Sequence, residues 1–441
     1  MSLDREEGRS LGAPVGDYAA QSRLAPGAWA LLAVLAALYA FLYVWQPATK
    51  RAVGGGDFAV YLTSGRMLLA GRTPYVTPGW NYPPLISFLV APLAALPFRT
   101  AWWWWFVLGH VCIGWAAWWT WRALGRGRRA LWAVAVTWTA GHALAVSLLE
   151  GQVNPLLLVL LCMALWPPRR APWSRGAAIA AAFALKVWPG ILWAEDLLRG
   201  RWRRLVGGVA LGAALTAAPL LVLACCFDGP LRPQRSGAFF GSPAFLNASL
   251  AGFAMRLADP PLRGSRLPPN WTAGLIEQLH ISTRDRVLGA AASFTALVAG
   301  LALLALALRR RVEPPREPWR LGAALVALAL VASPVSWPHY PVLQLPGTAA
   351  LAYGLAGARR WRRLGALAVC FLAVNWTEAL VIGPYVDAYG IVVAAPAVTW
   401  AITTLPVVGG VGLFVLHLLE LRRDQRDVAS SRLPAAATSR T

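Results

Sequence analysis

Long apolar runs alternate with short polar connections along almost the whole chain. A helix of about 20 apolar residues crosses the hydrocarbon core of a bilayer, which is about 30 Å thick. The pattern therefore predicts an all-α polytopic membrane protein with about 12 transmembrane helices, two of them short. The apolar runs lie at residues 28–45, 101–121, 130–149, 155–167, 176–186, 188–198, 205–226, 286–308, 320–336, 341–357, 364–383 and 391–419.

Two consecutive runs are too short to cross the membrane on their own. Residues 176–186 and 188–198 each make about 16 Å of helix, roughly half of the apolar core. Arginines flank both runs, which favours a hairpin with its apex at Lys186–Pro189, beneath a water-filled cavity open to the outside. The alternative is one ordinary span with Lys186 buried on a helix face, and it would reverse the orientation of every later span.

Arginine clusters between the runs predict the orientation in the membrane. With twelve spans, both termini and all of these clusters lie on the cytoplasmic side, as the positive-inside rule requires. The clusters are Arg122/Arg126/Arg128/Arg129, Arg169/Arg170/Arg175, Arg199/Arg201/Arg203/Arg204, Arg309/Arg310/Arg311/Arg316/Arg320 and Arg359/Arg360/Arg362/Arg363.

The predicted organisation is one membrane domain with two tails. Residues 1–27 form a cytoplasmic tail, 28–420 the transmembrane domain, and 421–441 a charged, disordered cytoplasmic tail. Two extracytoplasmic connections, 46–100 and 227–285, are long enough to fold and to form an active-site cavity. The chain has no internal repeat, which weakens the interpretation as a transporter.

Composition excludes several classes of protein. Of the 441 residues, 58% are hydrophobic and only 14% charged, which is not typical of a soluble globular domain. The net charge of +22 comes from cations between apolar runs, so membrane lipids rather than nucleic acid are the expected partners. The five cysteines fall within or beside apolar runs and show no metal-binding spacing. We therefore expect neither disulfides nor a bound metal.

Asp57 is the first candidate for chemistry. It follows three glycines in the first outer connection, and a charge this close to the bilayer is costly unless it is functional or paired. Such a carboxylate has the chemistry of a general base. The alternatives are an interfacial ion pair with Arg51, Arg66 or Arg72, or a helix cap for residues 58–69.

Lys186 is the second candidate, since it is one of only two lysines in a chain rich in arginine. At the apex of an apolar hairpin, its ammonium group is suited to binding a phosphate as a compact point charge. The alternative is a lysine that snorkels to the membrane interface as an anchor.

Two outer turns carry further polar residues. His339 follows the segment Ser333–Pro338, where it is suited to contacting a leaving phosphate or orienting a hydroxyl, although histidine beside Trp and Tyr is also ordinary interfacial composition. The turn Glu150–Asn154 is suited to binding a sugar or to capping the helix that begins at Pro155.

Known catalytic signatures are absent from the sequence. No Walker motif, GxSxG, HExxH or dinucleotide fingerprint occurs, and no pair of acids with metal-binding spacing lies on the outer side. These absences favour a reaction that needs neither a cofactor nor a metal ion.

The order of these segments resembles glycosyltransferase family 87 over roughly residues 50–345. The matching residues, in chain order, are Asp57, Tyr61, Gly71, Tyr75, Tyr82-Pro83-Pro84, Gly151-Gln152-Val153-Asn154, Lys186-Val187-Trp188-Pro189, Asn247-Ala248-Ser249-Leu250 and Ser333-Pro334-Val335-Ser336-Trp337-Pro338-His339-Tyr340.

The resemblance implies an integral membrane enzyme of the GT-C fold. Such enzymes take a sugar from a polyprenyl phosphate on the outer leaflet and invert its anomeric configuration. For this chain it implies Asp57 as the base, with Lys186 and His339 near the donor phosphate. The wider set of donor- and substrate-binding residues that we expect with them is Tyr340, Tyr82, Gln152, Asn154, Asn247 and Arg66.

The leading hypothesis is an α-mannosyltransferase of the plasma membrane. Its donor is polyprenyl-phosphate-mannose, and its acceptor is a glycolipid or lipoglycan of the phosphatidylinositol mannoside or lipomannan type. The alternatives are a flippase or transporter of lipid-linked sugars, which should carry charges along a midplane path, or an enzyme that moves another sugar such as arabinofuranose. The sequence leaves the acceptor, the linkage and the oligomeric state open.

Overall fold

The computed structural model describes the chain with several gaps. The described residues are 26–45, 56–78, 80–168, 171, 173–232, 247–258, 283–308, 319–334, 336, 339–377 and 396–430. Within these ranges the protein is helical, and the pairing between Arg72 and Asp228 is an isolated bridge rather than part of a sheet. The predicted all-α class is therefore confirmed.

Every predicted apolar run forms a helix in its described part. Breaks occur where helix-disfavouring residues or turns interrupt a run. The helices of the bundle are α1 (Pro26–Tyr39) with its π-helical continuation η2 (Ala40–Trp45), α5 (Phe98–Ala123), α6 (Arg128–Ala140), α7 (Ala143–Leu149), α8 (Asn154–Leu165), α9 (Ser174–Leu185), α10 (Trp193–Leu198), α11 (Trp202–Cys226), α14 (Thr283–Leu308), α15 (Trp319–Ala332), α16 (Leu345–Gly357), α17 (Trp361–Thr377) and α19 (Pro396–Ser430).

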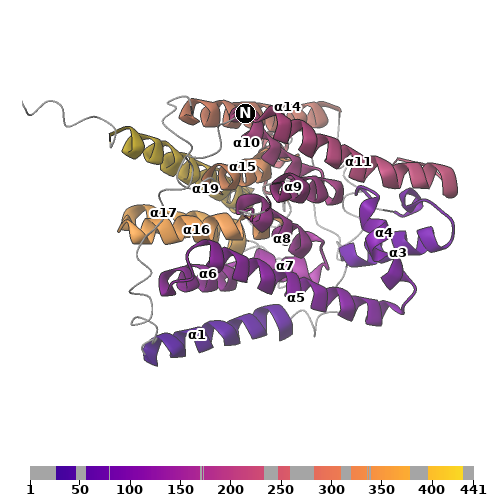
Figure 1. The fold of residues 1–441 in the computed structure, drawn as a ribbon, viewed down its shortest axis with the longest axis horizontal. Helices are drawn as coiled ribbons and strands as arrows, with labels where there is room; N and C mark the ends of the chain where they lie inside the picture. The colour runs from indigo at the N-terminus through magenta and orange to yellow at the C-terminus, as the bar shows by residue number, and fades with distance from the viewer. Residues whose placement is uncertain are drawn as a thin grey trace, which may run out of the picture.

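The two outer connections also fold in part. The first contains α3 (Gly56–Leu69), the 3₁₀ turn η3 (Pro74–Val76) and α4 (Leu85–Ala94), and the second contains α12 (Leu250–Ala258). Helices α3 and α4 pack on each other and lie together at one end of the bundle, at the right of Figure 1. The second connection joins this end, because Thr73 donates its backbone N–H to the Asp228 carbonyl over 2.9 Å.

Three described helices are long and apolar enough to cross a membrane. They are Trp202–Cys226, Arg286–Leu308 and Thr404–Arg423, and α6 with α7 makes a fourth if the pair, bent by 55°, counts as one span. Together with the shorter apolar helices they make this an integral membrane protein. The predicted number of about 12 crossings exceeds this count, because several of the apolar runs form helices that are too short to cross alone. The number of crossings stays a prediction.

The short runs at 176–198 form the predicted hairpin. Arg175 at the start of α9 donates to Glu195 Oε2 over 2.8 Å and to the Leu192 carbonyl over 3.2 Å. The chain therefore reverses after α9 and returns through the 3₁₀ turn η4 (Trp188–Leu192) and α10, with Lys186 at the apex. The alternative of one continuous span through Lys186 is wrong, because the helix ends at Leu185.

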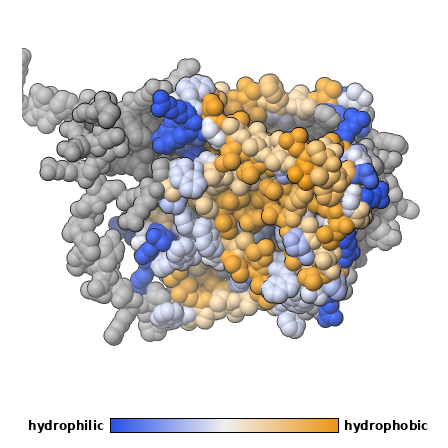
Figure 2. Space-filling view, turned by 45° about the vertical axis from the view of Figure 1, so that its right-hand side comes forward, coloured by the Kyte–Doolittle hydropathy of each residue, from blue (hydrophilic) through white to orange (hydrophobic). Residues whose placement is uncertain are grey.

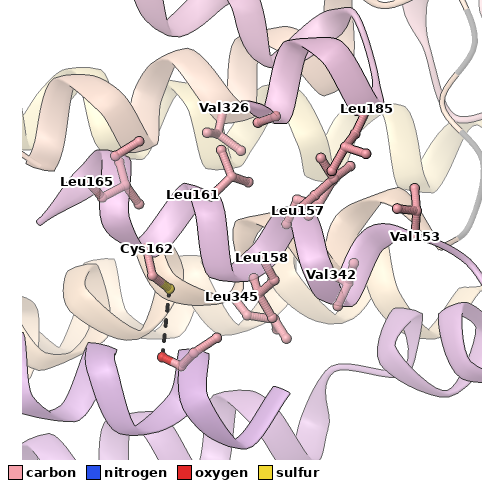
Figure 3. Packing of buried hydrophobic residues seen from close by; sticks show 14 of the residues in the cluster. Val153, Leu157, Leu158, Leu161, Cys162, Leu165, Leu185, Val326, Val342 and Leu345 are labelled. Atoms are coloured by element: carbon pink, nitrogen blue, oxygen red, sulfur yellow. Dashed lines mark hydrogen bonds between the residues drawn. The ribbon is translucent and has the colours of Figure 1, made fainter. Parts of the chain in front are cut away.

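Helix α8 lies at the centre of the core. Its Leu157, Leu158 and Leu161 are fully buried and pack with side chains from α9, α15, η7 and α16 (Figure 3). Every residue of α15 from Leu321 to Ala332 is buried as well, which is the pattern of a helix covered on all sides. Because the turn between α7 and α8 leads directly into α8, this core gives that turn a rigid support.

The surface is apolar over a wide area. Figure 2 shows one face on which hydrophobic residues form a continuous area with hydrophilic residues at its margins. Exposed side chains on α11 and α14 include Val206, Leu221 and Phe294. An apolar surface of this extent suits contact with lipid chains.

One predicted boundary at the C-terminus is wrong. We expected disorder after Glu420, yet α19 continues to Ser430. The ten residues that follow Glu420 include three arginines, one leucine, one glutamine and one alanine, all good helix formers. Residues 431–441 and the N-terminal tail before Pro26 lie outside the described residues.

Candidate active site

Asp57 lies in the first turn of α3 and is half-buried. A carboxylate is favourable there because it faces the positive end of the helix dipole. The next residue, Phe58, anchors the helix: its ring centroid is 5.6 Å from that of Trp102 and 5.7 Å from that of Trp105, both on α5. The aromatic packing therefore fixes where α3 begins and where Asp57 stands.

The turn between α7 and α8 meets Asp57. Gly151 has φ +63°, a left-handed conformation that suits glycine, and a Cβ there would lie only 2.6 Å from the Trp102 ring. Trp105 Nε1 donates to the Gly151 carbonyl over 2.8 Å. This close fit brings the next residue, Gln152, to Asp57, and its Nε2 donates to Asp57 Oδ2.

Lys186 reaches the same turn from the apex of the hairpin. Its Nζ donates to Gln152 Oε1 over 3.2 Å and to Asn154 Oδ1 over 3.0 Å, and the residue is only 5% exposed. The amide of Gln152 thus joins the carboxylate to the ammonium group. A buried lysine with two amide oxygens has no lipid headgroup to anchor, so snorkelling does not describe its position.

Tyrosines form the walls of this site. Tyr82 Oη donates to Asp57 Oδ1 over 3.4 Å, and Tyr61 Oη donates to Gln152 Oε1 over 3.0 Å. Lys186 Nζ lies 4.3 Å from the ring centroid of Tyr340 and 5.8 Å from that of Tyr82, within the range of cation–π attraction. The aromatic faces therefore stabilise the charge and give the site flat apolar surfaces of the kind that sugars stack on.

His339 joins the site mainly through its backbone. Its carbonyl accepts from Asn154 Nδ2 over 3.0 Å and from Ser147 Oγ over 3.1 Å. The imidazole is buried with its ring centroid 4.8 Å from that of Tyr340, and its Nε2 has no hydrogen-bond partner among the described residues. These bonds attach the His339–Tyr340 turn to the turn that carries Gln152.

Arg66, a residue of the predicted binding set, makes other contacts. Arg66 points to the end of α4, where its Nε donates to the Ala94 carbonyl over 3.4 Å. It lies nine residues after Asp57, about 13 Å further along the helix, so the alternative of an ion pair between these two residues does not hold. Arg72 lies in the backbone bridge to Asp228 at the far end of this connection, and Arg51 lies outside the described residues.

Asn247 supports the outer turn rather than meeting Asp57. Its Oδ1 accepts from the Ser336 backbone N–H over 2.8 Å, and its Nδ2 donates to the Pro334 carbonyl over 3.1 Å. The side chain is fully buried by these contacts. Its position is therefore that of a support for the segment that leads to His339.

Sequence reasoning missed two neighbours of Asp57. Tyr61 was absent from the predicted binding set, although its position four residues after Asp57 places it on the same face of α3. Glu150 was considered only as part of a sugar-binding turn. Its backbone carbonyl accepts the Phe58 N–H over 3.0 Å, so it lies directly against the start of α3.

Burial governs the electrostatics of the two acids. It raises the pKa of Asp57 above its usual value, while Lys186 and the hydrogen bonds from Gln152 and Tyr82 act in the opposite direction. Burial, with a smaller contribution from the charge of Asp57, raises the pKa of Glu150 to about 7. Asp57 is thus the acid that has a cation and two donors, and Glu150 holds a proton more tightly than an exposed glutamate does.

The described residues contain no group of three or more His, Cys, Asp or Glu side chains that is arranged to hold a metal ion. The five cysteines are free thiols in this structure. A reaction without metal stays a prediction.

Comparison with known families identifies the chain. The profile of glycosyltransferase family 87 matches residues 80–334, more than half of the sequence. The chain belongs to glycosyltransferase family 87. It is therefore a glycosyltransferase, and the resemblance found in the sequence is confirmed. The matched segment of the family 87 chain holds Tyr82, Gln152, Asn154 and Lys186, while Asp57 and His339 flank it.

Curated relatives of this family 87 enzyme come from mycobacteria. A polyprenol-phosphate-mannose-dependent alpha-(1-2)-phosphatidylinositol mannoside mannosyltransferase of Mycobacterium tuberculosis is 30% identical over 71% of this chain and 72% of its own length. A polyprenol-phosphate-mannose-dependent alpha-(1-2)-phosphatidylinositol pentamannoside mannosyltransferase of Mycolicibacterium smegmatis is 27% identical over 80% of each chain. No solved structure matches the chain significantly.

Proposed function

We propose that this family 87 glycosyltransferase moves mannose from polyprenyl-phosphate-mannose to a lipid-linked or lipoglycan acceptor, and that the sugar inverts its configuration. The observation that carries the proposal is the bridge through Gln152, which holds the carboxylate of Asp57 and the ammonium group of Lys186 in one tyrosine-lined site. The mycobacterial relatives, whose names give polyprenol phosphate mannose as donor and phosphatidylinositol mannosides as acceptors, support this choice of substrates.

In the proposed reaction Asp57 is the general base. It removes the proton of the acceptor hydroxyl while that oxygen attacks the anomeric carbon of the donor sugar. A carboxylate whose pKa is raised by burial is a stronger base than an exposed one, while Lys186 and the hydrogen bonds from Gln152 and Tyr82 favour its charged form. One base suffices for a single displacement, which inverts the anomeric centre.

Lys186 is assigned to the leaving group. As the bond between the anomeric carbon and the phosphate oxygen breaks, its electron pair stays on the polyprenyl phosphate. An ammonium group in a site with little water stabilises this developing charge strongly. The rings of Tyr82 and Tyr340, which already flank Lys186, are placed to stack on the sugar between the two charges.

The active site is proposed to face the outside of the plasma membrane, with both termini in the cytoplasm. Helix α5 supports this orientation, because Trp105 near its start contacts the site whereas Arg122 lies in its last turn. Its 26 residues make about 39 Å of helix, so Arg122 lies far from the site. The site and Arg122 lie at opposite ends of α5, and the positive-inside rule favours the cytoplasmic side for the end that carries Arg122.

The test is a defined transfer assay with purified enzyme in lipid nanodiscs. Polyprenyl-phosphate-mannose is supplied with phosphatidylinositol mannosides of increasing length, and products are read by mass spectrometry and NMR. We expect one added hexose in α-linkage from this donor and none from a nucleotide sugar. Transfer only from polyprenyl-phosphate-arabinofuranose, or movement of the donor across proteoliposomes without a new glycosidic bond, would overturn the proposal.

A further inference from the structure

Glu150 has a place in the site that the proposed reaction does not use. Its backbone carbonyl accepts the Phe58 N–H over 3.0 Å, and its carboxyl group accepts the backbone N–H of Asp57. Its Oε2 would lie only 2.9 Å from a Cβ at Gly56, so the carboxyl group covers the first residue of α3. A residue from another segment thus caps the helix that carries the base.

The cap places two carboxyl groups around one turn of backbone. The charged and titratable groups that act on Asp57 in this turn are Lys186 from the hairpin, Tyr61 on α3 itself, Tyr82 from the outer connection and Tyr340 from the last turn, and His339 lies beside Lys186 and Tyr340. Among the described contacts, Lys186 gives its hydrogen bonds to Gln152 and Asn154, and it gives none to Glu150. The cation therefore favours the ionised form of Asp57, and Glu150 has no cation among its described contacts.

Glu150 is also half-buried rather than enclosed. A group in this position exchanges protons with water while it touches the backbone of the base. Burial and the neighbouring charge raise its pKa to about 7. An acid or base transfers protons most efficiently when its pKa lies near the working pH.

We propose that Glu150 is a positioning residue that acts through Asp57, holding the first turn of α3 and receiving the proton that Asp57 takes from the acceptor. The inference rests on the proposed function. In the first step the acceptor O–H bond breaks and an O–H bond forms on Asp57. The hydroxyl electron pair joins the anomeric carbon as the bond from that carbon to the phosphate oxygen breaks, and the electron pair of that bond leaves with the polyprenyl phosphate. In the second step the proton moves from Asp57 to Glu150, and from there to water at the outer face, so Asp57 is ready for the next turnover.

The test compares Glu150→Gln with the wild-type enzyme over a range of pH. Glutamine keeps a carbonyl oxygen that accepts the Asp57 N–H, but it carries no exchangeable acid proton. We expect kcat to fall about tenfold to hundredfold, as for loss of a proton-transfer group, while the KM for polyprenyl-phosphate-mannose stays within about twofold. The wild-type kcat should rise with pH through an inflection near 7, and this inflection should be absent in the variant.

A second measurement keeps the inference testable if the variant is unstable. The pH profile of wild-type kcat alone must show the inflection near 7, and a flat profile there overturns the inference. A Glu150→Gln enzyme with wild-type kcat and an unchanged profile overturns it as well. An active Asp57→Asn enzyme would instead contradict the proposed function, so the two failures are distinguishable.

Discussion

Gln152 shows how a neutral side chain organises a charged site. Its amide donates to Asp57 and accepts from Lys186 and Tyr61, so every polar atom that it offers is used. The sequence predicted this residue, Asp57 and Lys186 from their outer placement and their resemblance to a family. It did not predict that one amide would join the two charges, because the pattern along a chain does not reveal which polar atoms meet in space.

Two other residues of the predicted binding set lie away from Asp57. Arg66 is near Asp57 in the sequence, yet nine residues along a helix separate two side chains by about 13 Å. Asn247 lies in a matching segment, but its amide binds the backbone around Ser336. Proximity along the chain and polarity identify candidates, and only the packing of α3 against its neighbours decides among them.

Replacement of Lys186 tests its assignment to the donor phosphate. Lys186→Met keeps much of the side-chain volume and removes the charge. Because a hydrogen bond to a charged group contributes about 1.5–3 kcal/mol, we expect the KM for the polyprenyl donor to rise roughly tenfold to hundredfold. Steady-state kinetics with varied donor measure this change.

The acceptor serves as the internal control for that variant. Its KM should stay near the wild-type value, because Lys186 faces the leaving group in the proposed reaction. An unchanged donor KM would return Lys186 to a purely structural role, in which it only holds Gln152 and Asn154.

Among the elements, the hairpin of α9, η4 and α10 decides where the cation stands. Its existence was predictable because two runs of about 16 Å between arginine-rich flanks do not cross a bilayer. The contacts that hold the two arms of the hairpin together were not predictable. The base of the hairpin is held by Arg175, which lies 2.8 Å from Glu195 and 4.0 Å from Asp196, with Arg199 3.2 Å from Glu195.

This ion cluster predicts that Glu195→Gln destabilises the protein. Removing one member of a buried ion pair leaves an uncompensated charge and typically costs about 3–5 kcal/mol. We expect a lower thermal midpoint in detergent and a reduced kcat, since the apex that carries Lys186 loses its support. Thermal unfolding followed by fluorescence measures the first effect.

Arg203→Met is the matched control, because Arg203 is exposed near the start of α11 and its removal should change stability by less than about 1 kcal/mol. The double variant Arg175→Met/Glu195→Gln should recover part of the loss, since it removes the unpaired charge. Equal midpoints for Glu195→Gln and Arg203→Met would show that the cluster does not hold the hairpin.

At the scale of the whole molecule, the chain combines a wide apolar surface with a polar site at one end. Helices α3 and α4 lie at that end of the bundle (Figure 1). Hydropathy predicted the helices because their side chains face lipid or a dry core. It did not predict the 55° bend between α6 and α7, which depends on the close packing around Gly141, where a Cβ would lie 2.8 Å from Leu345.

The orientation in the membrane is testable by cysteine labelling. Ala70 is exposed at the end of α3, and Ala123 is exposed at the end of α5. In a background with Cys225→Ser and Cys226→Ser, we expect Ala70→Cys to react with an impermeant maleimide in intact cells. Ala123→Cys should react only after the membrane is opened, and the reverse result would place the site in the cytoplasm.

The measurement that tests the central claim most directly is transfer by the Asp57→Asn enzyme under single-turnover conditions. Asparagine keeps the size of the side chain and removes the base, so we predict that sugar transfer is lost, by a factor of about 100 or more, while the donor still binds. Binding of polyprenyl-phosphate-mannose and a wild-type unfolding midpoint establish that the variant is folded. Turnover within about tenfold of the wild-type rate would contradict the account, because the acceptor would then lose its proton to a group other than Asp57.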